Sequence, residues 1–303
     1  MEEQIARGVG PDRIDIAYER RGDRSNPAAL LVMGIAAQMV NWPDAFCDAL
    51  VERGLQVIRF DNRDSGRSTH MTNAPEPSLP AALAGDLSSA SYTLSHMAAD
   101  AAGLLDALEL PAAHVVGASM GAAIAQTMAI RHPGRVLSLT SMMFTTGETT
   151  VGQPDPEAAR AIFGGAPAVT REEVIARALR TMSLVGSPRY PTDPAEVADR
   201  AGRAFDRDHD MTAVARQAVA TVASGDRTEA LRQVDVPTLV IHGLADRMCD
   251  VSGGRATAAA IPGAELMLVE GMGHDLPPGL RPRIADAIAR VVQRGEARLA
   301  PAP

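Results

Sequence analysis

A serine between two glycines lies where an apolar run meets a helix-forming run. The segment reads Gly117-Ala118-Ser119-Met120-Gly121, with His-Val-Val before it and Ala-Ala-Ile-Ala-Gln after it. A sharp turn from strand to helix crowds the backbone at both glycine positions, where a Cβ would collide, and it projects the serine hydroxyl from the surface. The N–H groups of the new helix favour negative charge at the same place. The pattern in this context predicts a nucleophilic Ser119 rather than a structural glycine turn.

A serine hydroxyl needs a base within hydrogen-bond reach, and His274 is the best placed of the seven histidines. It follows the apolar run 265–269, and Gly271 and Gly273 let the loop fold back over the strand end. His242 also ends an apolar run, but its apolar neighbours favour a packed core residue. The remaining histidines lack a place at the exit end of a strand or lie on helix faces, so His274 is the predicted general base.

An acid that orients the base is expected on a loop after another strand. Asp246 lies four residues past the apolar run Thr238–His242 and fits this place. Its rivals in sequence order are Glu148, Asp250 and Asp275. Asp250 is the nearest rival, whereas Asp275 adjoins His274 and would struggle to reach its ring. The chain order serine, aspartate, histidine is that of the α/β-hydrolases among the triad families.

Acyl transfer also needs backbone donors aimed at the developing oxyanion. The N–H of Met120, directly after the nucleophile, is the first expected donor. The second is expected from the loop after the strand 29–33, where Met33-Gly34-Ile35 lets the backbone turn towards the serine. We therefore predict an oxyanion hole formed by the N–H groups of Ile35 and Met120, although a plain glycine turn would have the same residues.

Short apolar runs alternate with Ala-rich helical stretches, which predicts an α/β fold with a mostly parallel sheet flanked by helices. The first run alternates in polarity and is expected to be an outer antiparallel strand. The predicted strands are Ile14–Glu19, Ala29–Met33, Gln56–Asp61, His114–Gly117, Val136–Met142, Thr238–His242 and Glu265–Val269. The stretch Met71–Ala90 is rich in chain breakers and is expected to be a long loop.

The alternation stops between the strands near 144 and 238, where the chain reads as helices only. Thr170 and Glu173 form a capping-box pattern, and Asp193-Pro194 is a typical helix start. We expect an α/β core at 1–146 and 226–303, with a helical cap at 147–225 inserted after the sixth strand and laid over the carboxyl edge of the sheet. A separate domain or a loose excursion is the alternative interpretation.

Composition excludes several functional classes. The chain has 303 residues, a net charge of -8 and 46% hydrophobic residues. It has no basic run for nucleic acid and no apolar window long enough for a membrane span. All 29 basic residues are arginine, which excludes Schiff-base chemistry and a Ser-Lys dyad. Cys47 and Cys249 form neither a disulfide framework nor a metal site. The N-terminus lacks a signal-peptide pattern, so we expect a cytoplasmic protein.

Taken together, several segments resemble the α/β-hydrolase superfamily and, more narrowly, bacterial serine carboxylesterases of the aclacinomycin methyl esterase group. They are Leu-Leu-Val-Met-Gly, Asn-Trp42-Pro-Asp, Val-Ile-Arg-Phe-Asp61-Asn-Arg63-Asp-Ser-Gly66-Arg-Ser68, Gly-Ala-Ser119-Met-Gly and Gly-Met-Gly-His274. The resemblance covers about residues 12–145 and 226–293 and implies a capped core that hydrolyses carboxylic esters without a cofactor. Met33 stands where many relatives have histidine, which changes the polarity expected near the oxyanion loop.

The leading hypothesis is hydrolysis of a fairly apolar, small to medium carboxylic ester through an acyl-enzyme intermediate. Lactone hydrolysis, C–C bond hydrolysis or perhydrolysis would need the same catalytic parts. A non-catalytic ligand-binding protein would have no need of the triad. A carboxylate nucleophile, as in related dehalogenases, is disfavoured because Ser119 stands at that position. The expected partner is the small-molecule ester, in a monomer or homodimer that binds neither nucleic acid nor membrane.

Overall fold

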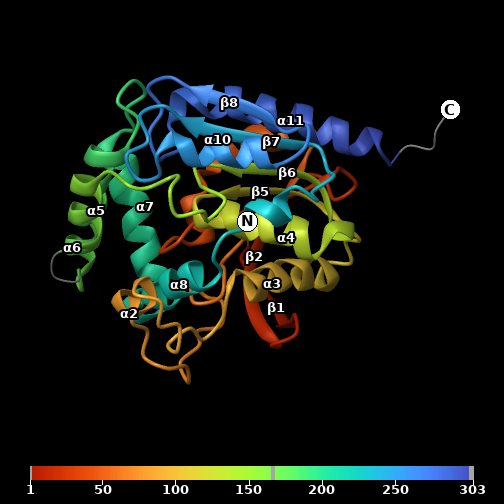
Figure 1. Ribbon diagram of the computed structural model, residues 1–303. Helices are drawn as coiled ribbons and strands as arrows, with labels where there is room; N and C mark the ends of the chain where they lie inside the picture. The colour runs from red at the N-terminus through yellow and green to blue at the C-terminus, as the bar shows by residue number, and fades with distance from the viewer. Residues whose placement is uncertain (1, 165–167, 300–303) are drawn as a thin grey trace.

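An eight-stranded sheet runs through the middle of the molecule in the order β1-β2-β4-β3-β5-β6-β7-β8 (Figure 1). The computed structural model describes residues 2–164 and 168–299. Strands β3 to β8 are parallel, whereas β2 pairs antiparallel with both β1 and β4. The strands are β1 (Gln4–Val9), β2 (Ile14–Arg21), β3 (Ala28–Val32), β4 (Gln56–Phe60), β5 (Ala113–Ala118), β6 (Val136–Met142), β7 (Thr238–Gly243) and β8 (Glu265–Val269).

Every strand that the sequence predicted is present, with ends that differ by at most two residues. The predicted first strand is antiparallel, as expected, but it is not the outermost one, because β1 pairs along its free side. In β1 only Ala6 and Val9 are buried. This spacing of three does not resemble the two-residue alternation of a strand, and it explains why β1 was missed.

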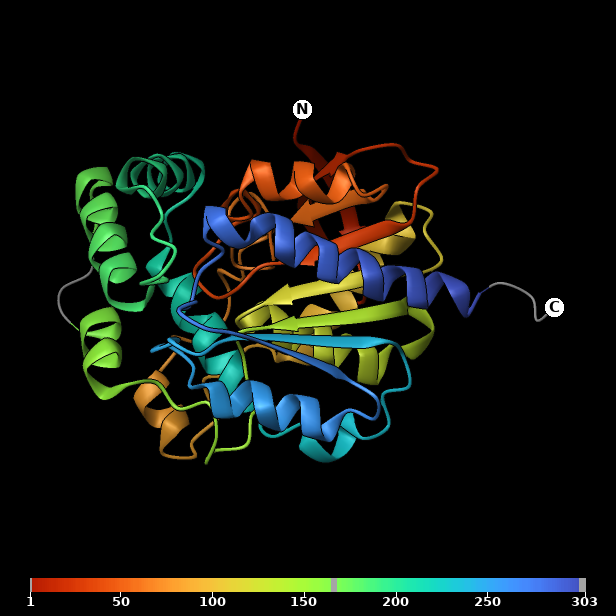
Figure 2. The ribbon, with the colours of Figure 1, turned by 90° about the horizontal axis from the view of Figure 1, so that it is seen from above.

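Helices cover both faces of the sheet, and each face has its own apolar core (Figure 2). α1 and α11 pack together on one face, while α3 and α4 pack together on the other, with α10 against β7. The α-helices are α1 (Asp44–Val51), α2 (Leu79–Leu83), α3 (Leu94–Ala107), α4 (Met120–Arg131), α5 (Pro156–Phe163), α6 (Arg171–Val185), α7 (Pro194–Arg207), α8 (Met211–Ala223), α9 (Thr228–Leu231), α10 (Val251–Ala260) and α11 (Arg281–Ala297). Short 3₁₀ turns lie at Met39–Asn41, Pro133–Arg135 and Pro278–Leu280.

Helices α5 to α8 lie between β6 and β7 in the chain, and the structure describes no strand among them. In Figure 2 the helices α5, α6 and α7 stand beyond the arrowheads of the parallel strands. The predicted helix starts are confirmed, since Thr170 caps α6 in a capping box with Glu173 and Asp193 caps α7. These helices are called the inserted helices below. Their assignment as a cap with bounds 147–225 stays a prediction.

The stretch expected to be a long loop contains a short helix, α2, which corrects that expectation in part. Ser78 caps it by accepting a hydrogen bond from the N–H of Ala81, and Pro80 lies in its first turn. Because proline and serine also mark turns, the sequence pattern alone could not separate this helix start from a loop. α2 packs against α8 of the inserted helices.

The loop after β4, residues 61–70, is fixed to the inserted helices by buried ion pairs; it is called the β4 loop below. Asp61 pairs with Arg207 at the end of α7, at 2.7 Å. Asp64 pairs with both nitrogens of the Arg216 fork in α8, at 2.8 and 2.9 Å. Both carboxylate side chains are completely buried. Each loop carboxylate is therefore compensated by an arginine of the inserted helices, without which it would be a buried, uncompensated charge.

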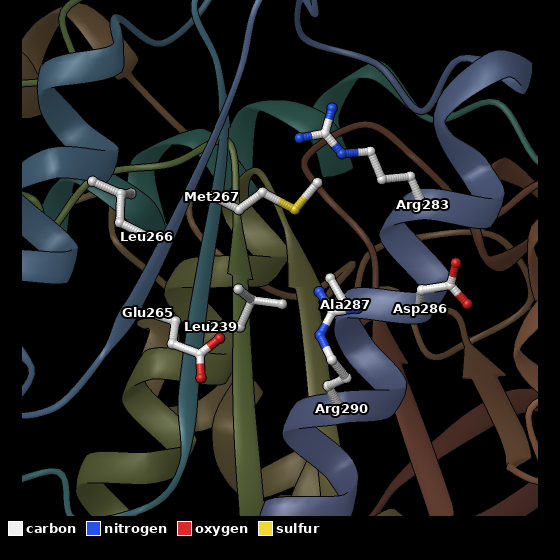
Figure 3. Close-up of a pocket in the computed structure, with 8 residues that line it drawn as sticks. All are labelled: Leu239, Glu265, Leu266, Met267, Arg283, Asp286, Ala287 and Arg290. Carbon is white, nitrogen blue, oxygen red and sulfur yellow. The ribbon is translucent and has the colours of Figure 1, made fainter.

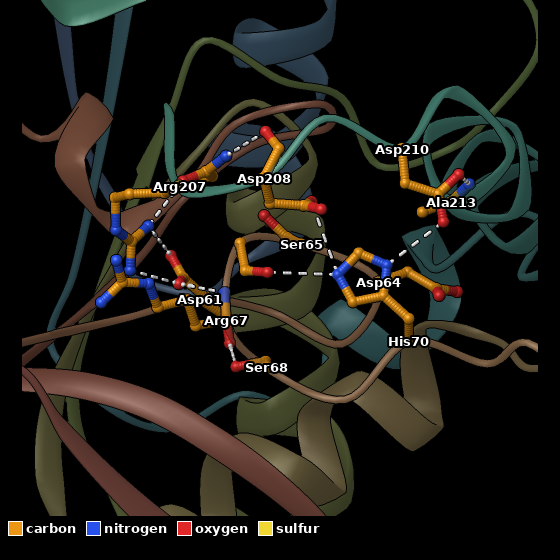
Figure 4. A network of polar contacts seen from close by, with 12 residues as sticks. Asp61, Asp64, Ser65, Arg67, Ser68, His70, Arg207, Asp208, Asp210 and Ala213 are labelled. Atoms are coloured by element: carbon orange, nitrogen blue, oxygen red, sulfur yellow. Dashed lines mark hydrogen bonds and ion pairs between the residues drawn. The ribbon is translucent and has the colours of Figure 1, made fainter. Parts of the chain in front are cut away.

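His70, at the end of the β4 loop, extends this connection (Figure 4). Its ring lies between Asp208 and Asp210, with nitrogen–oxygen distances of 3.4 and 3.3 Å, and its Nε2 also lies 3.2 Å from the carbonyl oxygen of Gly66. Figure 4 shows the two aspartates approaching the ring from the segment that joins α7 to α8. The β4 loop is thus held at both ends by the same pair of helices.

Both cysteines are buried and unpaired. Cys47 packs in the buried face of α1. Within the part of the chain that the structure describes, no helix combines the length and apolar character that crossing a membrane requires.

A third buried ion pair holds the β4 loop to α3 and generates a stability prediction. Arg63 binds Asp100 through two nitrogens at 2.6 and 2.7 Å, and both side chains are at most 2% exposed. We expect Asp100→Ala to lower the free energy of unfolding by about 3–5 kcal/mol, because it leaves a buried guanidinium with too few partners. Urea denaturation followed by circular dichroism measures this loss.

Asp106→Ala is the matched control on the same helix, because Asp106 pairs with Arg135 but is 68% exposed. Its loss should stay below about 1 kcal/mol. Equal losses from the two variants would contradict a special contribution of the buried pair.

Candidate active site

Ser119 sits in a strained turn between β5 and α4. Its φ of 54° and ψ of -130° lie in a region that residues with a side chain rarely adopt. A Cβ on Gly117 would collide with the backbone of Gly121, and one on Gly121 would collide with the carbonyl oxygen of Val32 in β3. The sequence argument expected crowding at both glycines, and the structure adds that the second one is crowded by the neighbouring strand.

The hydroxyl of Ser119 meets the ring of His274 at the carboxyl edge of the sheet. The distance from Ser119 Oγ to His274 Nε2 is 3.1 Å. On the other side of the ring, His274 Nδ1 lies 2.8 Å from Asp246 Oδ2. The structure therefore brings together three predicted residues that are far apart in the sequence. A proton can pass from the hydroxyl to Nε2 while the carboxylate holds the Nδ1 proton and the ring orientation.

Asp246 is a buried carboxylate with a complete set of donors. Its Oδ1 accepts hydrogen bonds from the N–H groups of Met248 and Cys249, at 2.8 and 2.9 Å. Burial by itself would raise the pKa of Asp246, but the His274 charge and hydrogen bonds from His242, His274 and the Cys249 N–H hold this pKa far below its ordinary value. Asp246 therefore stays ionised wherever His274 accepts a proton from the serine.

The other acids that the sequence offered lie elsewhere. Asp250 is exposed and caps α10 by accepting from the N–H of Ser252. Asp275 points away from the adjacent ring and accepts hydrogen bonds from Ser187 and Thr192. Glu148 accepts from the hydroxyl of Thr150. Of the four candidate acids, only Asp246 forms a hydrogen bond with the His274 ring.

The loop that carries His274 is hydrogen-bonded to the end of α6 and to the segment after it, which the sequence did not indicate. The N–H of His274 donates to the carbonyl oxygen of Val185 at 2.6 Å, and the N–H of Gly273 donates to Ser187 Oγ at 2.9 Å. Ser187 in turn donates to Asp275. Burial raises the pKa of Asp275 in spite of these bonds. The inserted helices thus help to set the height of the imidazole above the sheet.

The two expected oxyanion donors lie beside the serine. Met120 is the first residue of α4, so its N–H has no acceptor inside the helix. Gly34 approaches so closely that a Cβ there would lie 3.0 Å from the Cβ of Ser119. Across residues 2–164 and 168–299, the N–H groups of Ile35 and Met120 donate to no other protein atom. Both are available to an oxygen bound next to Ser119, and their role as donors stays a prediction.

His242 was expected to be a packed core residue, and it is fully buried. It also has a polar contact that the pattern missed. Its Nε2 donates to the carbonyl oxygen of Cys249 at 2.8 Å and lies 3.5 Å from Asp246 Oδ2. The His242 ring therefore stabilises the turn from Asp246 to Cys249 through this hydrogen bond. Its position at the end of β7, directly before the acid, was the available signal.

Two cavities lie outside this catalytic arrangement. One of about 460 Å³ opens between β8 and α11, where Figure 3 shows Met267 beside Arg283 and Arg290. The other, of about 610 Å³, is lined mainly by α6, α7 and the segment between them, and it is called the cap cavity below, after the cap predicted at 147–225. Its walls include Ala245 and Arg247, which flank Asp246 in sequence, and Ser187, which binds the His274 loop. The cap cavity is therefore the one next to the candidate site.

No cluster of three or more His, Cys, Asp or Glu side chains suited to a metal ion occurs in the described parts of the chain. The arrangement at Ser119 combines a hydroxyl, an imidazole, a buried carboxylate and two nearby backbone N–H groups. Such a set can attack a carbonyl carbon and stabilise the oxyanion that results.

Comparison with known proteins places this geometry in a family. Residues 27–277 match the sequence model of the alpha/beta hydrolase fold. The chain is 31% identical to rhodomycin D methylesterase DnrP of Streptomyces peucetius, over 93% of this chain and 96% of that protein. It is 30% identical to rhodomycin D methylesterase DauP of Streptomyces sp. (strain C5), with the same coverage. The crystal structure of a hydrolase from Pseudomonas aeruginosa PA01 superposes with a TM-score of 0.70 at 24% identity, covering 97% of this chain and 98% of that one, which shows a shared fold.

The contact between Asp246 and His274 generates a prediction about the reactivity of Ser119. In Asp246→Asn, an amide replaces the carboxylate that holds the Nδ1 proton, and the ring loses both its tautomer and its charge partner. We expect labelling of Ser119 by a fluorophosphonate to slow by about 10⁴. Intact-mass spectrometry over time measures the labelling rate.

Asp250→Asn is the matched control in the same loop, because asparagine caps a helix as well as aspartate does. It should label at the wild-type rate. The assignment of Asp246 would be wrong if both variants reacted equally fast.

Proposed function

Because this chain belongs to the α/β-hydrolase family and is a hydrolase acting on carboxylic esters, we propose that Ser119, His274 and Asp246 form its catalytic triad. The observation that carries this proposal is the chain of contacts from Ser119 Oγ through the His274 ring to Asp246, at 3.1 and 2.8 Å. The buried, ionised state of Asp246 supports the role of His274 as a base, since an imidazolium next to it would be stabilised.

The proposed reaction proceeds through an acyl-enzyme. Ser119 Oγ attacks the ester carbonyl carbon while its proton moves to His274 Nε2. The carbonyl oxygen becomes an oxyanion, which accepts hydrogen bonds from the N–H groups of Ile35 and Met120. The bond to the alcohol then breaks, and His274 returns the proton to the departing oxygen. Water repeats the sequence at the acyl carbon and releases the carboxylic acid and the free serine.

We further propose that residues 147–225 act as a cap that selects a fairly apolar, small to medium ester. The cap cavity supports this, because its lining is dominated by Leu179, Met182, Leu184, Val197 and several prolines. Its wall includes Ala245 and Arg247 on either side of Asp246, and Ser187, which accepts a hydrogen bond from the N–H of Gly273 next to His274. The names of the two methylesterases that resemble this chain support a methyl ester among the substrates.

The nucleophile is tested by Ser119→Ala with a p-nitrophenyl ester as substrate. Removal of the hydroxyl leaves only binding and the oxyanion donors, so we expect turnover to fall by about 10⁶. Steady-state release of p-nitrophenol measures it, and intact mass should reveal an acyl adduct on the wild-type chain alone.

Near wild-type turnover by Ser119→Ala would exclude the proposed mechanism. A panel of esters, lactones and β-diketones, ranked by kcat/KM on the wild type, tests the reaction class. A higher rank for lactones or β-diketones would keep the nucleophile but replace the ester as the proposed substrate.

The cap cavity generates a prediction about acyl-chain length. Leu179→Trp fills space in the cavity and should displace about two methylenes of a long acyl chain, each worth about 0.8 kcal/mol of burial. We therefore expect kcat/KM for p-nitrophenyl decanoate to fall about tenfold, while that for the acetate changes less than about twofold.

Val169→Trp provides the control, because Val169 is 65% exposed just before α6 and does not line the cavity. It should leave both specificity constants unchanged. A parallel loss for acetate and decanoate in Leu179→Trp would place the acyl chain elsewhere.

A further inference from the structure

The Gly34–Ile35 peptide contains the second proposed oxyanion donor, the N–H of Ile35. No helix or strand hydrogen bonding orients this N–H towards Ser119. Met120 differs in this respect, because its N–H is aimed by the start of α4. The loop at Ile35 lies outside any helix or strand. Its orientation must therefore be fixed by contacts to its neighbours.

Both peptides that flank the Gly34–Ile35 peptide are held by buried side-chain amides. On one side, Asn62 Nδ2 donates to the carbonyl oxygen of Met33 at 2.9 Å. On the other side, the N–H of Ala36 donates to Gln217 Oε1 at 3.1 Å. Because a peptide unit is planar, fixing one of its polar groups fixes the whole unit. The peptide between the two clamped units is therefore left with little freedom to rotate.

The hydrogen bonds from Asn62 and to Gln217 are needed because Ala36 is strained: its φ of 57° lies in the left-handed region. A non-glycine residue leaves that region unless its surroundings hold it there. Relaxation of Ala36 would turn the peptide before it and carry the Ile35 N–H away from the serine. The hydrogen bond from Ala36 to Gln217 opposes this relaxation.

Gln217 is itself immobilised. It is completely buried in α8, and its Nε2 donates to the carbonyl oxygens of Arg63 and Asp64, at 3.0 and 3.4 Å. Its neighbour Arg216 makes the two-nitrogen ion pair with Asp64. Gln217 therefore joins the β4 loop, which also carries Asn62, to the oxyanion loop.

We propose that Gln217 and Asn62 are positioning residues that together aim the Ile35 N–H at the oxyanion. This inference rests on the proposed esterase function and adds that α8 supplies part of the catalytic machinery. An oxyanion donor lowers the barrier only if it points at the developing charge before the reaction begins. Loss of either amide should therefore weaken transition-state stabilisation much more than substrate binding.

The test uses Gln217→Met, which keeps the length of the side chain and removes both hydrogen-bonding groups. For p-nitrophenyl acetate we expect kcat to fall about 10- to 100-fold and KM to change less than about threefold, because a misaimed donor costs less than the roughly 10²–10³ of a deleted one. An aryl trifluoromethyl ketone provides a second readout. Ser119 Oγ adds to its carbonyl carbon, the proton passes to His274, and the ketone oxygen becomes an oxyanion. Its affinity should fall by the same factor as kcat/KM.

Gln126→Met is the matched control. Gln126 is also a completely buried glutamine, but it binds Ser141 and Arg227, away from the oxyanion loop. It should lower the melting temperature at least as much as Gln217→Met while leaving kcat and the ketone affinity at wild-type values. A purely structural role for Gln217 would instead lower the melting temperature and leave the ketone affinity unchanged, which would overturn the inference.

Asn62→Ala tests the hydrogen bond on the other side of the Gly34–Ile35 peptide. It replaces Gln217→Met as the test if that variant does not fold. A tenfold or larger loss of kcat and of ketone affinity supports the inference, whereas unchanged values overturn it. In the double variant the combined loss should be smaller than the product of the single losses, because both act on one peptide. Ser119→Ala separates a failure of the proposed triad from a failure of the positioning role. Activity in Ser119→Ala refutes the triad. An inactive Ser119→Ala together with a fully active Gln217→Met refutes only the positioning role.

Discussion

The strained turn at Ser119 is the constraint on which the rest of this site depends. A φ of 54° with a ψ of -130° costs about 1–3 kcal/mol for a residue with a side chain. The turn persists because everything around it is fixed: β5 is buried along its whole length, and the N–H of Ser119 donates to Met142 in the next strand. The same turn sets the direction of the hydroxyl and the start of α4. One strained turn therefore positions the proposed nucleophile and one of the two proposed backbone donors together.

Buried arginines connect the inserted helices to this rigid centre. Arg207 and Arg216 reach Asp61 and Asp64 in the β4 loop, and each aspartate is shielded from water. Arginine suits this task better than lysine, because its planar fork binds both oxygens of a carboxylate at once, as Arg216 does. The exclusive use of arginine need not be a functional choice, but in this fold it provides the bidentate pairs that a buried junction requires.

The sequence could predict those parts of the site that local rules determine. Ser119 has its own motif, and Asp246 and His274 each follow an apolar run that forms a parallel strand, so the meeting of parallel strand ends at one edge was enough to bring them together. β1 was missed because its buried positions are three residues apart. Gln217 and Asn62 left no pattern, since each binds a backbone group of a distant segment, and a polar residue on a helix or after a strand is ordinarily solvated. The contact between Gln217 and Ala36 spans 181 residues.

The two proposed oxyanion donors also differ in what they depend on. The Met120 N–H follows from the elbow and needs no other part of the chain. The Ile35 N–H depends on side chains from the β4 loop and α8, and the loop that carries His274 depends on the segment after α6. The helices that line the cap cavity and those that hold these catalytic loops belong to one continuous insertion. If the proposed roles hold, a change of substrate pocket in this protein cannot be independent of its chemistry, because displacement of the insertion moves both the proposed base and one proposed donor relative to a serine that stays fixed.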